Sequence, residues 1–152
     1  MIQRVQSIWL FLAGLTLFLL LILPIVSFHG TGTEQVFQAG GLYQKNGAAV
    51  QQTAAYPALF GGFLFAGITG LLSIFLFRNR QLQQRVIILC ILLTLAFTAL
   101  SAFYIMGVSA AAGSPAVQIG AALPLLSVIF CVLAISGIRR DEALIRSADR
   151  LR

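Results

Sequence analysis

The stretch "VIILCILLTLAFTALSAFYIMGV", residues 86–108, contains no Asp, Glu, Lys, Arg or His. A helix of about 20 apolar residues is long enough to cross the hydrocarbon core of a bilayer, which is roughly 30 Å thick. Inside that core each backbone amide and carbonyl needs a partner within the protein, and a helix supplies one for nearly all of them. The stretch therefore predicts a membrane-spanning helix.

Three further runs of the same kind lie on either side of this stretch, at residues 7–28, 58–77 and 119–138. Of the 152 residues, 59% are hydrophobic and only 9% are charged, whereas about 25% are charged in soluble domains. So few charges cannot cover the surface of a water-soluble globule. We therefore expect one integral membrane domain, residues 1–152, with an all-α fold: a four-helix transmembrane bundle.

The loop between the first two runs, residues 29–57, is the longest segment that is not strongly apolar. It contains two strand-like stretches, "EQVFQ" and "GLYQK", and the turn signal Asn46-Gly47 follows them. An isolated hairpin is marginally stable in water. We therefore expect a small β-prone loop that packs against the helix ends on the extracytoplasmic side.

Basic residues are distributed unevenly between the two ends of the predicted bundle. Nine of the ten Lys and Arg residues lie in the N-terminus, the loop at 78–85 or the tail at 139–152, and Lys45 alone lies in the outer loop. Short loops rich in Lys and Arg remain in the cytoplasm, so we expect a multi-pass protein with both termini cytoplasmic. Charges that flank apolar runs account for the net charge of +6, and we expect no nucleic-acid partner.

The second run carries small residues at a spacing of four: Gly62, Ala66 and Gly70. Residues at this spacing share one helix face, and small side chains there allow another helix to approach closely. The face predicts helix packing. It could be used within the bundle or in contact with a second molecule.

Catalytic and metal-binding groups are scarce in this sequence. His29 is the only histidine, and the outer side offers only His29 and Glu34 as acid–base groups, too few for a catalytic triad or a metal site. Cys90 and Cys131 both lie inside apolar runs, where cysteine is most often a small buried hydrophobe. We therefore expect no enzyme activity, no metal and no cofactor.

The tail "RRDEALIRSADRLR", residues 139–152, has no Gly or Pro and is rich in helix-forming residues. We expect the last transmembrane helix to continue through it into the cytoplasm. Both cytoplasmic ends are candidate contacts for a protein partner or for anionic lipid headgroups. The candidate contact residues are Arg4, Arg139, Arg140, Asp141, Glu142, Arg146, Asp149 and Arg150.

The start "MIQRVQSIWLFLAG" and the end "IRRDEALIRSADRLR" resemble a family of small four-span inner-membrane proteins of Bacteroidota, which is classed as a domain of unknown function. The resemblance implies a location in the bacterial inner membrane. It implies no activity, cofactor or site residue.

Three functions remain open on these observations. The preferred one is an accessory or scaffold subunit, or a homo-oligomer, that docks through its cytoplasmic ends and the glycine-rich face. The alternative is a small-molecule or lipid carrier with a cavity between the helices, suggested by the hydroxyl groups in the spans together with Pro24 and Pro124. A membrane-embedded enzyme is the third and least supported.

Overall fold

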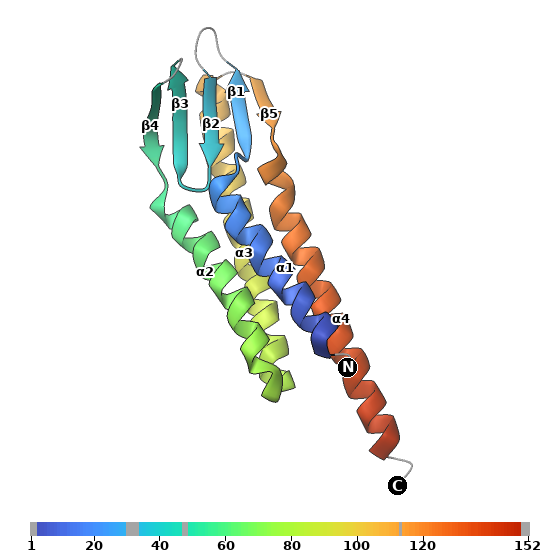
Figure 1. The fold of residues 1–152 in the computed structure, drawn as a ribbon. Helices are drawn as coiled ribbons and strands as arrows, with labels where there is room; N and C mark the ends of the chain where they lie inside the picture. The colour runs from blue at the N-terminus through green and yellow to red at the C-terminus, as the bar shows by residue number, and fades with distance from the viewer. Residues whose placement is uncertain (1–2, 30–33, 47–48, 113, 150–152) are drawn as a thin grey trace.

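The computed structural model describes residues 3–29, 34–46, 49–112 and 114–149. Within them, four long helices carry an antiparallel β-sheet at one end (Figure 1). In chain order the elements are α1 (Gln3–Ile22), β1 (Val26–His29), β2 (Glu34–Gln38), β3 (Gly41–Asn46), β4 (Ala49–Ala55), α2 (Pro57–Phe75), the 3-10 turn η1 (Leu76–Arg78), α3 (Arg80–Ala112), β5 (Ser114–Val117), the 3-10 turn η2 (Ile119–Ala122) and α4 (Leu123–Asp149).

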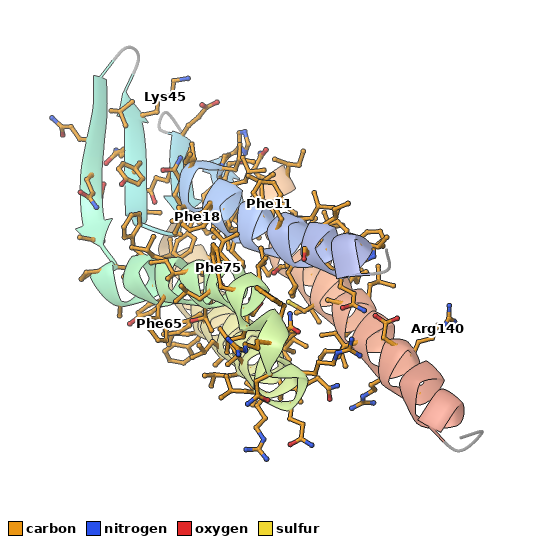
Figure 2. All side chains as sticks on the ribbon, turned by 60° about the horizontal axis from the view of Figure 1, so that its bottom comes forward. Phe11, Phe18, Lys45, Phe65, Phe75 and Arg140 are labelled. Carbon is orange, nitrogen blue, oxygen red and sulfur yellow. The ribbon has the colours of Figure 1, made fainter. Side chains whose placement is uncertain are left out.

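Helix α1 packs between α2 and α4, and α3 packs against both α2 and α4. All four helices are long and apolar enough to cross a membrane, which confirms the predicted number and character of the helices. Large apolar side chains also cover the outside of the bundle, including Phe11, Phe65 and Phe75 (Figure 2). A helix that is apolar all round suits an environment of lipid or of other protein. The fully buried side chains between the helices include Leu10, Leu17, Leu20, Phe63, Ile87, Cys90 and Cys131.

The sheet has five strands in the order β4-β3-β2-β1-β5, with every neighbouring pair antiparallel. The predicted stretches "EQVFQ" and "GLYQK" form β2 and most of β3. Strands β1, β4 and β5 were not predicted, so the sheet is larger than the expected hairpin. Because β5 follows α3, the sheet also joins the two connections on this side of the bundle.

The first helix ends earlier than predicted. A single span was expected at residues 7–28, but α1 ends at Ile22 and β1 begins at Val26. Pro24 lies between them and has no N–H to continue a helix. The backbone groups here bond elsewhere: the Ile25 N–H donates to the Phe37 carbonyl at 2.8 Å, and the Gly120 N–H donates to the Pro24 carbonyl at 3.0 Å.

Helices α3 and α4 extend beyond their predicted ends, whereas α2 (Pro57–Phe75) ends two residues before the predicted 77 and α4 begins at Leu123 rather than at residue 119. Helix α3 covers residues 80–112 rather than 86–108. Helix α4 continues through the charged tail as far as Asp149, which confirms that the tail is helical over that length.

Aromatic rings join the sheet to the helices. Phe37 of β2 is fully buried, and its ring centroid lies 5.7 Å from that of Tyr56, which directly precedes α2. The Tyr56 ring in turn stacks on Tyr104 of α3 at 4.6 Å. The sheet is therefore packed on the helix ends, as a marginal β-structure requires.

Candidate functional site

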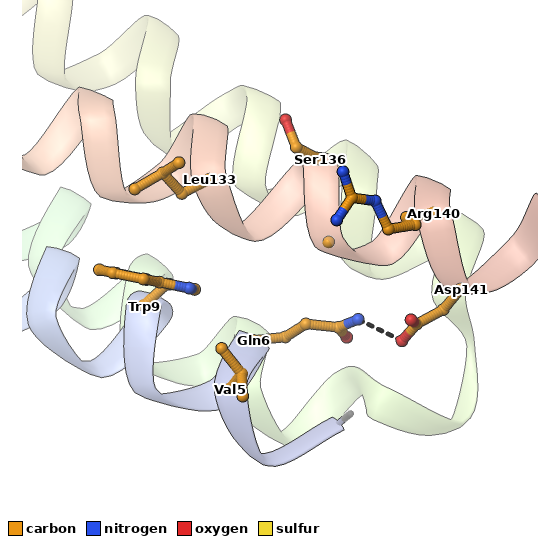
Figure 3. A pocket seen from close by; sticks show the side chains of 8 residues that line it. Val5, Gln6, Trp9, Leu133, Ser136, Arg140 and Asp141 are labelled. Carbon is orange, nitrogen blue, oxygen red and sulfur yellow. Dashed lines mark hydrogen bonds between the residues drawn. The ribbon is translucent and has the colours of Figure 1, made fainter. Parts of the chain in front are cut away.

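Helices α1 and α4 enclose a pocket of about 470 Å³ at the end of the bundle opposite the sheet (Figure 3). The lining residues are spaced three and four apart along α4, so they occupy one face of that helix. One wall of the pocket is apolar and the opposite end is polar. The lining residues are Val5, Gln6 and Trp9 from α1, and Leu133, Ser136, Gly137, Arg140 and Asp141 from α4.

A glycine allows the two helices to approach closely beside the pocket. A Cβ atom at Gly137 would lie 3.1 Å from Cγ of Gln6, which is tighter than ordinary van der Waals contact. Near this point the ring of Trp9 stacks on Phe130 of α4, with centroids 5.7 Å apart. The Gln6 side chain passes over Gly137 and reaches Asp141, one turn further along α4.

Asp141 is the polar centre of the site. It is only 8% exposed, and its Oδ2 accepts a hydrogen bond from Nε2 of Gln6, whose side chain is equally buried (Figure 3). Its Oδ1 is buried and has no hydrogen-bond partner among the described residues. Leaving a buried polar atom unpaired costs about 1–3 kcal/mol, and more when the group is charged. The pocket therefore presents an unsatisfied acceptor.

Arg140 and Ser136 of α4 also line the pocket. Figure 3 shows the guanidinium of Arg140 extending from α4 back toward Ser136, on the same side as the pocket. Arg140 is exposed, and Gln6, which bonds Asp141, is uncharged. The pocket thus combines an anionic point, a cationic point and an apolar wall, an arrangement that suits an amphiphile with a zwitterionic end.

The charged side chains that line the pocket are Arg140 and Asp141, and the lining contains neither His nor Cys. In the part of the chain that the structure describes, no group of three His, Cys, Asp or Glu side chains could hold a metal ion.

Of the predicted contact residues, the structure brings Arg140 and Asp141 into the pocket and leaves Arg139 exposed outside it. Asp141 was predicted as a candidate contact on the cytoplasmic tail, and in the structure its side chain is buried. The side chains of Arg4, Glu142, Arg146 and Asp149, and all of Arg150, lie outside the described residues.

Sequence reasoning missed Gln6, Trp9 and Gly137 as site residues. A signal for Asp141 was available, because it lies three residues after Ile138 and seven after Ala134, both of which are buried. A residue at that spacing falls on the same helix face.

The glycine-rich face of α2 lies inside the bundle. Gly62, Ala66 and Gly70 are all buried. A Cβ at Gly62 would lie 2.3 Å from the Phe97 ring of α3, and one at Gly70 would lie 3.6 Å from Sγ of Cys90 and 3.8 Å from Gly14 of α1. The expectation that a partner docks on this face is therefore wrong, because α1 and α3 already occupy it.

A second cavity lies beneath the sheet, where the alternative hypothesis expected one. Its volume is about 160 Å³, and Thr98, Ser101 and Pro124 are among its lining residues. The Thr98 hydroxyl donates to the Thr94 carbonyl and the Ser101 hydroxyl to the Thr98 carbonyl. Both hydroxyls are therefore satisfied within α3, and the cavity is mainly apolar.

Comparison with protein families gives a match. The family model described as a domain of unknown function (DUF4293) matches residues 2–151, and no curated protein matches the chain. This confirms the expected membership of a family of unknown function. The expected restriction of that family to Bacteroidota stays a prediction. With nearly its whole length matched, the chain belongs to the DUF4293 family.

Proposed function

We propose that this chain is a multi-pass protein of the bacterial cytoplasmic membrane that acts as a non-enzymatic accessory or scaffold subunit. It docks on a second membrane protein through the part of α4 beyond Asp141, which we call the α4 extension (residues 142–149). The observation that carries the proposal is that α4 continues past the ends of the other helices (Figure 1).

Four long apolar helices support the membrane location. The charges at the two ends of the molecule support the orientation. Lys45 lies at the sheet end, whereas Arg140 lies at the opposite end (Figure 2), close to Arg139 and on the side of the 78–85 loop. The positive-inside rule assigns the arginine-rich end to the cytoplasm, and both termini follow it.

The length of the α4 extension supports a docking role. Eight residues of helix add about 12 Å beyond Asp141 at 1.5 Å per residue. A free helix of that length would be marginal in water, but this one continues a longer helix and needs no nucleation of its own. The Gln6–Asp141 hydrogen bond holds α4 to α1 at the root of the extension.

The charge pattern of the tail favours a protein partner over a uniformly anionic surface. Residues 139–152 carry five arginines and three carboxylates. Positive and negative residues are interspersed along this sequence, and charge complementarity favours a partner surface that also carries both signs.

The cavity beneath the sheet gives the carrier hypothesis little support. Pockets that bind drug-sized molecules typically measure about 300–1,000 Å³, and the cavity beneath the sheet is about 160 Å³. Its hydroxyl groups bond to their own helix.

Photo-crosslinking in native membranes tests the docking role. A benzoylphenylalanine at Ala143, an exposed position on the α4 extension, should form a discrete adduct with one membrane protein. The same group at Leu92, which is 59% exposed on the apolar surface of α3, serves as the control and should not form that adduct. Mass spectrometry of the adduct identifies the partner. Identical products from both positions, or none from Ala143, would refute the proposal.

A truncation provides the matching stability control. Removal of residues 143–152 should abolish the partner adduct when the crosslinker is moved to Arg139. It should leave thermal unfolding of the bundle unchanged, because Asp141 is the last buried residue described on α4.

A further inference from the structure

We propose that the pocket between α1 and α4 binds one phospholipid whose headgroup carries a primary ammonium. The ammonium bonds to Asp141, the phosphate bonds to Arg140, and the acyl chains lie along the apolar wall. The inference rests on the membrane location proposed above and is independent of the docking role of the α4 extension.

The buried carboxylate of Asp141 defines the first part of the ligand. One of its oxygens bonds to Gln6 and the other has no partner in the described structure. The Gln6 amide is neutral, and none of the described arginines forms an ion pair with Asp141. Burying an unpaired charge is strongly unfavourable, so the ligand should supply both a hydrogen-bond donor and a positive charge.

A primary ammonium meets both requirements. It carries one positive charge and N–H donors that can reach the free oxygen. A water molecule would satisfy the hydrogen bond but leave the charge uncompensated. A calcium ion would require six to eight oxygen ligands, and the pocket offers one carboxylate and one amide. A quaternary ammonium has charge but no donor.

Arg140 defines the second part of the ligand. It neighbours Asp141 in the chain, lines the same pocket and extends toward Ser136 (Figure 3). A guanidinium binds phosphate oxygens in a bidentate manner. An ethanolamine phosphate carries both an ammonium and a phosphate, so one headgroup supplies a partner for each of the two oppositely charged side chains that line the pocket.

The apolar wall indicates a lipid rather than a soluble amine. Val5, Trp9 and Leu133 line the pocket, and Val5 is half exposed on the outside of the bundle. The apolar stretch of α4 ends at Asp141, so the polar part of the pocket lies at the level where headgroups meet the hydrocarbon. Acyl chains can leave the pocket along this surface without entering water.

Trp9 is the only tryptophan in the chain, which makes its fluorescence a direct probe of the pocket. The purified protein in detergent micelles is titrated with phosphatidylethanolamine that carries brominated acyl chains, which quench a nearby tryptophan. The parallel titration uses brominated phosphatidylcholine with the same chains. We expect half-maximal quenching at a roughly tenfold lower concentration of the ethanolamine lipid, the ratio that one charge-assisted hydrogen bond provides.

Three variants separate the contributions of the side chains. D141N keeps a side chain that can bond Gln6 but removes the charge, and it should abolish the preference for ethanolamine over choline. R140Q should weaken binding of both lipids by a similar factor. R139Q is the matched control, because Arg139 is exposed outside the pocket, and it should bind both lipids as the native chain does.

The proposal remains testable even if D141N fails to fold. In the native chain, successive N-methylation of the headgroup should weaken quenching step by step as donors are lost. Equal quenching by ethanolamine and choline lipids would overturn the proposal. So would displacement of the brominated lipid by soluble phosphoethanolamine as effectively as by the unbrominated lipid, because the ligand would then be a soluble amine.

Discussion

Replacing Gly62 by alanine should destabilise the bundle through a single clash. The added Cβ would lie 2.3 Å from Cε1 and Cζ of Phe97 and 2.5 Å from its Cδ1. Carbon atoms normally pack about 3.5–4.0 Å apart, so the ring of Phe97 must move by more than 1 Å. Phe97 is itself packed against Phe63, with centroids 6.1 Å apart, and the displacement therefore spreads to a fully packed neighbour.

The expected magnitude combines two opposing effects. Overpacking a core position costs about 1–3 kcal/mol, whereas replacing glycine by alanine in a helix gains roughly 0.5–1 kcal/mol. We therefore expect G62A to lower the free energy of unfolding by about 0–2.5 kcal/mol. Gly61 is the matched control, because a Cβ there would meet no atom within 4 Å. G61A should gain only the helix contribution.

Reversible unfolding in mixed detergent micelles, followed by far-UV circular dichroism, measures both variants. F97A supplies the rescue: in that background the ring is absent, and G62A should behave as G61A does. If G62A is as stable as G61A in the native background, the close approach of α2 and α3 is refuted. A cost that persists in the F97A background would show that Phe97 is not its cause.

Two further predictions concern helix proximity and orientation. Cys90 on α3 and Cys131 on α4 are buried free cysteines that lie beside each other. Copper phenanthroline should therefore join them within one chain, with loss of both maleimide-reactive thiols, and covalent dimers as the only product would contradict this packing. The orientation is tested in a chain whose two cysteines are replaced by serine. In that background Q51C on β4 should react with an impermeant maleimide in intact cells, whereas R139C should react only after permeabilisation. The reverse pattern would exclude the orientation derived from the arginines.

Much of the sheet could not be read from the sequence. Strands β2 and β3 were predicted because their residues are strand-forming and a turn signal follows them. Strand β1 (Val26–His29) directly follows an apolar run, and a short apolar segment of this kind is compatible with either helix or strand. Strand β5 (Ser114–Val117) contains a proline and only four residues. Strands β1 and β5 can be identified only from their hydrogen bonds in the sheet, where β1 pairs with both β2 and β5.

The candidate site could not be predicted from the sequence either. Asp141 follows two arginines in a charged tail, and hydropathy alone assigns it to solvent. Its partner Gln6 lies 135 residues away, and no local pattern relates the two. The burial of Asp141 depends on the close approach of α1 and α4 at Gly137.

The sequence by itself determined the number of long helices, their apolar character and the helical continuation of the tail, because hydropathy and helix propensity are properties of neighbouring residues. Only the tertiary structure decided that the first helix ends at Ile22, that five strands from two connections form one sheet, and that Asp141 is buried in a pocket. The physical reason is that strand hydrogen bonds and side-chain contacts join groups far apart in the chain. The energies of these hydrogen bonds and contacts depend on which segments lie together in the fold, and the composition of one segment does not determine which segments those are.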